Sequence, residues 1–254
     1  MEFDFATPIT KDIQLNALYK EGSIDPNNPT LENLIAAMQT GNPSLFFPIG
    51  SDILDTYNGA PTSWKLVHYG TAIRSDNLAT VQGAYLMLNR EALSASQFAS
   101  SANIERGYLY SNVHSYVTTG GGYTTASQYA ITIKVSYCGM SGIGASATID
   151  YAIGDCKFFA PSSTNLGTIS NPNDIVWDYF KTNSNATRIW HSSTGPAIDY
   201  WTRDWSGTYR SYEYYMRYVQ ASGAFQTSPG YSGTWALSNY YSIPCCFIPA
   251  YPQE

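Results

Sequence analysis

The strand-forming residues of this chain occur in short runs separated by long polar segments, and this pattern limits the folds open to it. From Trp190 onward, short apolar runs alternate with loops rich in Ser, Gly, Thr and Asn. The two helical patterns both lie earlier in the chain. Strands that alternated with helices would indicate a parallel sheet, whereas early helices followed by short strands indicate an α+β domain. We therefore expect an α+β fold with short antiparallel strands, two helices and long loops.

The first helix is predicted to follow Thr30, because threonine is a favourable N-cap residue. The apolar residues that follow are spaced for one face of a helix: Leu31, Leu34, Ile35 and Met38. Gly41 is placed to end this helix. A second and weaker helical pattern lies between Ser101 and Thr118, where Gly107 interrupts it and Tyr and Val lower its helix propensity.

Several runs have the composition of β-strands. They are residues 46–49, 64–69, 84–88, 129–137, 156–159 and 243–248. Residues 57–61 contain an Asn-Gly pair followed by Ala-Pro and predict a turn, and the three glycines at 120–122 predict a break in regular structure. Alternate residues of a strand face opposite sides, so the run at 243–248 is expected to be a core strand.

The composition argues against two classes of partner. Only 13% of the residues are charged, about half the usual fraction, so uncharged polar and aromatic side chains must cover much of the surface. The net charge of −6 comes with no cluster of Lys or Arg, as nucleic acid or an anionic membrane surface would require. No apolar run approaches the roughly 20 residues that span a bilayer, and the first residues lack the pattern of a signal peptide. We expect no nucleic-acid partner and no membrane insertion.

Catalytic patterns are weak. The three histidines, His68, His114 and His191, are isolated, and neither an H-E-x-x-H nor a G-x-S-x-G motif occurs. The glycine-rich stretch 139–144 lacks the helix that a nucleophile elbow or a phosphate-binding loop needs. Two of the nineteen acidic residues could converge in space for glycoside hydrolysis, and the sequence leaves that alternative open. We expect no enzymatic activity and no cofactor.

Metal sites and disulfides are not expected either. The four cysteines have no metal-site spacing and are expected to be buried free thiols: Cys138, Cys156, Cys245 and Cys246. Residues 171–174, Asn-Pro-Asn-Asp, carry oxygen atoms of the kind that calcium prefers. A solvated turn is the expected structure for this segment.

The strongest functional signal lies in residues 200–241, which hold nine Tyr and three Trp among Ser, Gly, Thr and Asn. Tyr and Trp give large contact areas with few rotors to fix, and Ser, Gly and Asn give adaptable hydrogen bonds. The alternative is that these aromatics fill a core, but those of 209–218 are too closely spaced for all to point inward. Trp177 and Trp201 are expected in the core. The expected ligand-binding residues are Asp204, Trp205, Ser206, Thr208, Tyr209, Ser211, Tyr212, Tyr214, Tyr215, Tyr231, Trp235, Asn239 and Tyr240.

Residues 3–17 resemble the closing strand of an internalin-type B repeat, a repeat found in bacterial surface proteins. Only the last part of such a repeat is present. The Pro- and Asn-rich residues 23–29 have the composition of a linker. We expect residues 1–22 to form a partial repeat strand and linker, and residues 23–254 to form the ligand-binding domain.

Seven segments carry a second resemblance. They are FPIG (47–50), DTYNG (55–59), FFAPS (158–162), WDYF (177–180), YWTR (200–203), YVQASG (218–223) and YSIPCCFI (241–248). In this order they resemble the C-type-lectin-fold proteins of bacteria, phages and prophages, which include the variable proteins of diversity-generating retroelements. In those relatives the segment equivalent to residues 204–240 forms the exposed ligand-binding face, where substitutions concentrate.

The resemblance implies an adhesin or receptor-binding protein of a bacterial cell surface or phage tail, whose partner is a protein or glycan on a cell or virion. The alternative is a carbohydrate-binding module in which Trp205, Trp235 and several tyrosines stack on sugars. The same fold also occurs in formylglycine-generating enzymes, but their reactive cysteine motif has no counterpart here. A calcium-lectin signature is also missing, and a shared fold does not establish an activity.

Overall fold

The computed structural model describes residues 24–99, 107–141, 148–168, 171–209, 213–226 and 239–251, and in the strand segments 138–141, 148–150, 205–209 and 213–215 it describes the backbone alone. The helices are α1 (Leu31–Gln39), α2 (Asn112–Gly122) and α3 (Asn185–Arg188), with 3₁₀ helices η2 (Pro43–Leu45), η4 (Tyr108–Tyr110), η5 (Thr125–Gln128) and η7 (Asp178–Phe180). The strands are β1 (Asp52–Tyr57), β2 (Ala60–Ile73), β3 (Thr80–Leu88), β4 (Ile133–Ser141), β5 (Thr148–Cys156), β6 (Phe158–Phe159), β7 (Trp190–His191), β8 (Ala197–Ile198), β9 (Tyr200–Tyr209), β10 (Glu213–Val219), β11 (Phe225–Gln226) and β12 (Cys245–Pro249). These helices and antiparallel sheets make the chain an α+β protein. The predicted repeat strand at residues 1–22 lies outside the described residues.

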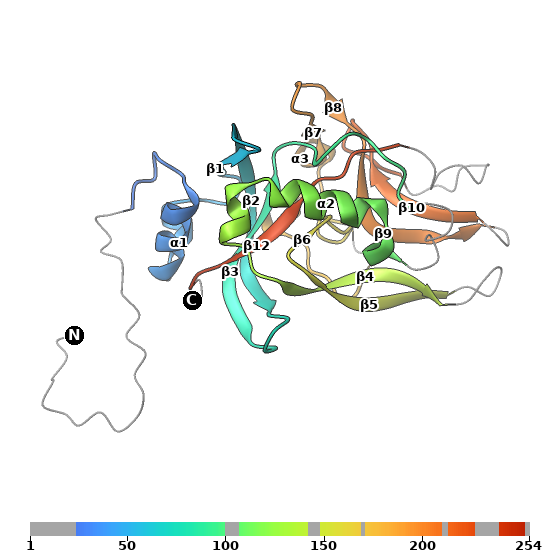
Figure 1. Ribbon diagram of the computed structural model, residues 1–254, viewed down its shortest axis with the longest axis horizontal. Helices are drawn as coiled ribbons and strands as arrows, with labels where there is room; N and C mark the ends of the chain where they lie inside the picture. Colours follow the sequence, from blue (N-terminus) through green and yellow to red (C-terminus); the bar gives the residue numbers. More distant parts are fainter. Residues whose placement is uncertain are drawn as a thin grey trace, which may run out of the picture.

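A five-stranded antiparallel sheet forms the centre of the molecule, in the order β1-β2-β3-β12-β6 (Figure 1). Its strand β12 comes from the end of the chain and pairs with β3 on one side and β6 on the other. The core strand predicted at residues 243–248 is therefore confirmed, with its pairing beginning at Cys245.

The central sheet separates two hydrophobic cores. In β12, Cys245 and Phe247 pack into one core, while Cys246 and Ile248 pack into the other. This alternation follows from the strand geometry, because successive side chains of a strand point to opposite faces. All four side chains are buried, which explains why β12 is apolar throughout rather than alternating with polar residues.

Helix α1 follows its sequence signals. The hydroxyl of Thr30 accepts a hydrogen bond from the backbone N–H of Asn33 at 3.3 Å, as the N-cap role requires. The helix ends at Gln39, and Gly41 then adopts a φ of +82°, in the left-handed region that favours glycine. Its apolar face packs into the core that also holds Cys246.

The turn predicted at residues 57–61 joins β1 to β2. Asn58 and Gly59 form a two-residue loop with φ values of +49° and +79°, which is the geometry that an Asn-Gly hairpin favours. The strand predicted at residues 46–49 was wrong. Pro43 begins the 3₁₀ helix η2, and the N–H of Phe47 donates back to the Pro43 carbonyl at 2.9 Å. Proline fixes φ and has no N–H, so this segment turns instead of pairing.

Helix α2 runs through the three glycines that were predicted to break the chain. The hydroxyl of Ser111 caps its start by accepting from the N–H of His114 at 3.0 Å. A Cβ on Gly121 would lie 2.3 Å from the ring of Phe158, so the helix could not approach β6 so closely with any larger residue. The predicted break therefore falls at the end of the helix, at Gly122, and contact with the sheet offsets the low helix propensity of the glycines in its last turn.

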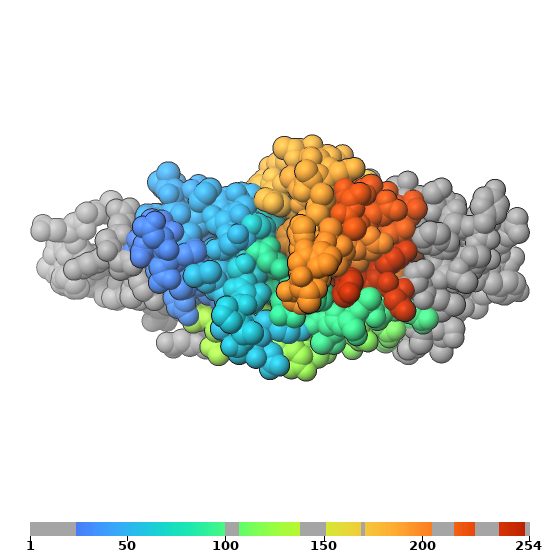
Figure 2. Space-filling model, turned by 90° about the horizontal axis from the view of Figure 1, so that it is seen from above, coloured from blue at the N-terminus to red at the C-terminus, as the bar shows by residue number. Residues whose placement is uncertain are grey.

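Two hairpins, β4–β5 and β9–β10, extend toward the same end of the molecule, and α1 lies at the opposite end (Figure 1). Strand β4 begins at Ile133, four residues later than predicted, because Tyr129 belongs to the turn that follows η5. From above, the N-terminal part of the described chain and the C-terminal strands occupy different halves of the visible face (Figure 2). The described strands of the segment expected to bind a ligand, β9 and β10, thus extend toward the end of the molecule remote from α1.

Candidate functional site

The expected binding segment begins on the β9–β10 hairpin, which we call the ribbon. The two strands pair from Tyr200 with Val219 at the base to Tyr209 with Glu213 at the far end. The base is buried, and the far half of the ribbon carries several expected ligand-binding residues. The six in its strands are Trp205, Ser206, Thr208, Tyr209, Tyr214 and Tyr215. Four more lie outside the described residues: Ser211, Tyr212, Tyr231 and Trp235.

A cluster of aromatic rings holds the base of the ribbon. The rings of Tyr218 and Tyr240 are stacked with centroids 4.2 Å apart and an interplanar angle of 21°. The ring centroid of Trp201 lies 6.1 Å from that of Tyr218 and 4.7 Å from that of Tyr240. Phe98 and Trp201 make an edge-to-face contact with centroids 5.5 Å apart. Trp201 is only 1% exposed, which confirms its predicted place in the core.

Backbone hydrogen bonds fix the same aromatic residues. The carbonyl of Ser96 accepts from the indole Nε1 of Trp201 at 2.9 Å and from the N–H of Tyr240 at 3.1 Å. The N–H of Trp201 in turn donates to the carbonyl of Tyr241 at 2.9 Å. The chain that leads into β12 is thereby joined to the first residues of β9.

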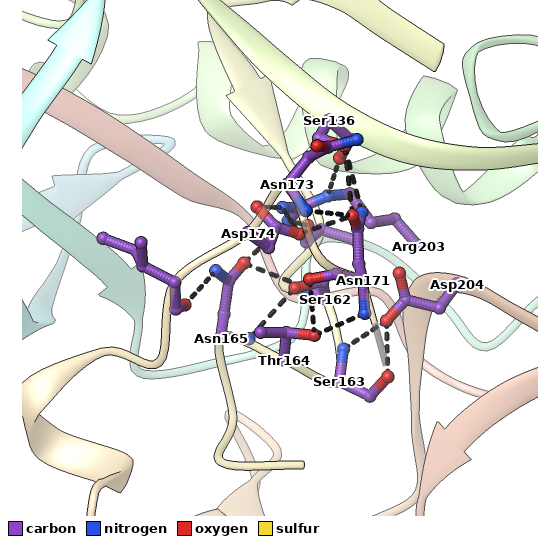
Figure 3. Close-up of polar contacts among 12 residues, drawn as sticks. Ser136, Ser162, Ser163, Thr164, Asn165, Asn171, Asn173, Asp174, Arg203 and Asp204 are labelled. Atoms are coloured by element: carbon purple, nitrogen blue, oxygen red, sulfur yellow. Dashed lines mark hydrogen bonds and ion pairs between the residues drawn. The ribbon is translucent and has the colours of Figure 1, made fainter. Parts of the chain in front are cut away.

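Arg203 follows Trp201 by two residues on β9 and forms a second anchor (Figure 3). Its guanidinium group donates to the carbonyls of Ser136 and Ala160, each at 2.7 Å, and to Asn165 Oδ1 at 2.9 Å. It also binds both carboxylate oxygens of Asp174, at 2.8 and 2.7 Å. These five hydrogen bonds equal the number of N–H donors on a guanidinium group.

The charge of Arg203 is retained although the side chain is fully buried. Burial alone would lower the pKa of Arg203, but the carboxylates of Asp174 and Asp204 outweigh this effect and raise it. A buried guanidinium with a bidentate carboxylate partner is a rigid joint, because both groups are planar and their hydrogen bonds fix one relative orientation. It connects β9, β4 and the segment 160–174.

Asp204 was expected to lie on the binding surface, and the structure corrects this. Its side chain is 0% exposed, and its carboxylate accepts hydrogen bonds from the backbone N–H and the hydroxyl of Ser163, the latter at 2.6 Å. Burial raises the pKa of Asp204, although Arg203 and Ser163 act in the opposite direction. Asp204 therefore supports the ribbon and does not face a ligand.

The turn expected at residues 171–174 is present, with Pro172 and Asn173 exposed, but the residues at its two ends bond to the interior. Asn171 is 0% exposed, and its side chain bonds to Ser136 while its backbone N–H donates to Thr164 Oγ1 at 2.8 Å. The carboxylate of Asp174 forms an ion pair with the guanidinium group of Arg203. No local pattern in the sequence marked this polar network, because its members come from four separate segments of the chain.

The two remaining described residues of the expected surface differ from each other. Asn239 is exposed, whereas Tyr240 is partly buried by its stack on Tyr218. Tyr240 therefore presents only part of its ring at this end of the molecule. Two described residues of β5 also expose apolar surface there, Tyr151 at 37% and Ile153 at 66%.

Among the side chains that the structure describes, the cysteines and histidines add no reactive centre to the ribbon. Cys156, Cys245 and Cys246 are free and buried, as predicted, and burial raises the pKa of each thiol, that of Cys156 to about 11. The side chain of Cys138 is outside the described residues. His68 Nδ1 lies 2.8 Å from Asp178 Oδ2, and this contact joins β2 to η7.

Comparison of the chain with protein-family models, with curated proteins and with solved structures finds no match in any of the three. Among the residues that the structure describes, no group of three or more His, Cys, Asp and Glu side chains is placed to hold a metal ion. No helix in the described ranges is long and apolar enough to cross a membrane.

Proposed function

We propose that this chain is a ligand-binding protein without catalytic activity, and that the far half of the ribbon and the segment leading to β12 form its binding surface. The observation that carries the proposal is the rigid anchor at the base of β9. Residues 200–204 are buried and fixed by Arg203 and the ring cluster, while the polar and aromatic residues from 205 onward continue beyond that anchor. Rigid support beneath a contact surface raises affinity by lowering the entropy lost on binding.

The composition of the segment supports a recognition role. Between the anchor at Arg203 and the first residue of β12, the chain carries Tyr, Trp, Ser, Gly and Asn in abundance. This is the composition of antibody-type contact surfaces, where rigid aromatics supply area and small polar residues adapt to the partner. The partner we propose is a protein or glycan on a cell or virion surface.

We further propose that the scaffold is of the C-type-lectin type found in variable proteins of diversity-generating retroelements. The α+β class, the antiparallel sheets and the central position of the last strand agree with this assignment. It would place the protein on a bacterial surface or a phage tail. A neighbouring reverse-transcriptase gene, together with a near-copy of the codons for residues 200–248, would support the assignment, and their absence would count against it.

The binding role is tested by two sets of alanine substitutions. The surface set replaces Ser206, Thr208, Tyr209, Tyr214 and Tyr215, and the core set replaces Trp177, Trp201, Phe247 and Ile248. Labelled wild-type chain is applied to a glycan array, and immobilised wild-type chain is used to select from a displayed peptide and protein library. The affinity of each recovered ligand is then measured for both sets of variants. The array separates the carbohydrate alternative from protein recognition.

The surface set is expected to lose at least about 2 kcal/mol of binding free energy, while its melting temperature stays near that of the wild type. Each core substitution is expected to cost about 3–5 kcal/mol of stability. If the surface set unfolds as readily as the core set, the ribbon aromatics are packing residues and the proposal fails. Ligands that bind the surface set as tightly as the wild type would exclude this surface as their site.

A further inference from the structure

The start of α2 holds a histidine with one ring nitrogen closed off from solvent. His114 is the third residue of the helix, and its backbone N–H donates to Ser111 Oγ at 3.0 Å. Its imidazole meets the ring of Tyr108 edge-to-face, with centroids 5.0 Å apart. The Nδ1 atom is buried and has no hydrogen-bond partner among the described residues. A neutral ring can leave this nitrogen without a hydrogen.

A protonated ring would not fit this place. An imidazolium carries a hydrogen on both nitrogens, so protonation of His114 would turn Nδ1 into a donor without an acceptor, which is uncommon and costly in a folded protein. The new charge would also lie in the first turn of α2, where unpaired backbone N–H groups already carry partial positive charge. Burial accordingly lowers the pKa of His114 below its ordinary value of 6.5.

No charged group on the elements around α2 offsets this cost. The helix packs against η4, η5, β6 and β12, and segment 92–99 accepts hydrogen bonds from its first residues. Besides His114, the titratable residues of the helix and of these elements are Tyr108, Tyr110, Tyr116, Cys245 and Cys246. All of them are uncharged at neutral and acidic pH, and segment 92–99 has no titratable side chain. These elements therefore offer no carboxylate to a protonated His114.

Tyr108 connects this histidine to the anchor of the ribbon. The phenol oxygen of Tyr108 accepts from the backbone N–H of Ala160 at 2.6 Å, and the Ala160 carbonyl accepts from Arg203 Nη1 at 2.7 Å. The Ser111 hydroxyl, which caps α2, donates to the Tyr108 carbonyl at 2.6 Å. Tyr108 is 0% exposed, so its ring cannot move without repacking of the core. The start of α2 and the base of β9 thus share one supporting residue.

We propose that His114 is an acid-sensitive joint, whose protonation separates the start of α2 from η4 and loosens the support that Tyr108 gives to the base of the ribbon. The packed imidazole takes up a proton less readily than a released one. The packed state is therefore favoured in full above pH 6.5 and loses stability as the pH falls below that value. The joint needs no ligand. A weakening of ligand binding by acid would rest on the function proposed for the ribbon.

Hydrogen–deuterium exchange of the full chain tests the joint, with protection compared at about pH 7.5 and about pH 5 after correction for the intrinsic exchange rates. In the wild type, residues 108–116 are expected to lose protection about five-fold or more at the lower pH, as one unsatisfied buried donor would cause. Residues 200–204 are expected to lose protection with them, because Tyr108 supports both. Helix α1, at the opposite end of the molecule, is expected to keep its protection.

A pair of substitutions assigns the effect to His114. His114→Phe keeps an aromatic ring and removes both nitrogens, so residues 108–116 are expected to stay protected at both pH values. The matched control is His191→Phe, because His191 is exposed on β7 and its Nδ1 lies 2.8 Å from the Gly195 carbonyl. This control is expected to respond to acid as the wild type does.

A second measurement needs no substitution at position 114. The Cε1–H signals of the three histidines are followed against pH by NMR in the wild type. Those of His68 and His191 are assigned by their loss in His68→Gln and His191→Phe. The remaining signal belongs to His114, and it is expected to report a pKa below 6.5.

The proposal is overturned if His114 titrates at or above 6.5, if residues 108–116 keep their protection in acid, or if His114→Phe loses it as the wild type does. Loss of protection in 108–116 that leaves 200–204 unchanged would refute the connection to the ribbon. No ligand enters these measurements, so their failure leaves the binding role of the ribbon untouched. Conversely, a surface set that binds as the wild type does refutes the binding role and leaves the joint untouched.

Discussion

The guanidinium group of Arg203 binds both carboxylate oxygens of Asp174, although the two residues are 29 positions apart in the chain. Asp174 lies in the segment after β6, and Arg203 lies in β9 immediately before the ribbon residues expected to bind a ligand. The pair therefore joins the loop that holds Asp174 to the base of the ribbon. Because Arg203 is fully buried, the loss of Asp174 would leave its charge without the carboxylate that binds the guanidinium group directly.

Asp174→Leu is expected to reduce the free energy of unfolding by about 3–5 kcal/mol, because an unpaired buried charge costs that much. The double variant Arg203→Met, Asp174→Leu is expected to lose less than the sum of its two single variants, by at least about 1 kcal/mol. Urea denaturation of the four proteins gives these values. Strictly additive losses would show that the two side chains are not energetically coupled.

Gly121 and Gly122 are neighbours in α2 that should respond oppositely to alanine. A Cβ on Gly121 would lie 2.3 Å from the Phe158 ring, whereas one on Gly122 would meet nothing within 4 Å. Gly122→Ala is expected to stabilise the protein by up to about 1 kcal/mol through helix propensity. Gly121→Ala is expected to destabilise it by about 1–3 kcal/mol through overpacking. Thermal unfolding of both variants measures the difference, and equal effects would mean that α2 does not contact Phe158 as described.

Asn239 and Tyr240 provide a second neighbouring pair. Tyr240→Ala removes a ring stacked on Tyr218 and packed on Trp201, and is expected to cost about 2 kcal/mol of stability. Asn239→Ala changes an exposed side chain and is expected to alter stability by no more than about 0.5 kcal/mol. Guanidinium denaturation followed by tryptophan fluorescence tests both. A neutral Tyr240→Ala would remove this residue from the base of the ribbon.

The buried thiol of Cys156 makes stability dependent on alkaline pH. Burial raises its pKa from the ordinary value of 9.0, which holds for the unfolded chain, to about 11 in the folded protein. The stabilising contribution is fully present below the unfolded value and is lost as pH rises from there to about 11, because the unfolded thiol ionises first. Between these limits the wild type is expected to lose up to about 2–3 kcal/mol more stability than Cys156→Ala does.

Urea denaturation of the wild type and Cys156→Ala at a series of pH values from neutral to alkaline measures this difference. Other groups that titrate in the same range act equally on both proteins, so only the difference between the two curves is used. Parallel curves would show that Cys156 ionises as readily in the folded protein as in the unfolded chain. Alkylation with iodoacetamide at neutral pH gives an independent check, since the buried thiol should react only after unfolding.

Local patterns in the sequence were enough to predict several elements. Thr30 and the apolar spacing after it predicted α1, and the Asn-Gly pair at 58–59 predicted the hairpin turn. The apolar run at 243–248 predicted a core strand, and the burial of Trp177 and Trp201 was also predicted. These features depend on residues that are neighbours in the chain, where capping, turn geometry and side-chain periodicity act directly.

The structure alone decided the features that depend on distant partners. Gly121 lies within a helix that only glycine allows so close to β6, because Phe158, from another part of the chain, occupies the space that a side chain would fill. Asp204 is buried because Ser163 satisfies its carboxylate. Asp174 is a structural ion-pair partner because β9 places Arg203 beside it. The sequence by itself determined which residues were apolar, aromatic or able to turn. Only the tertiary structure decided which polar groups meet, since the cost of burying a charge depends on the partner that the fold brings to it.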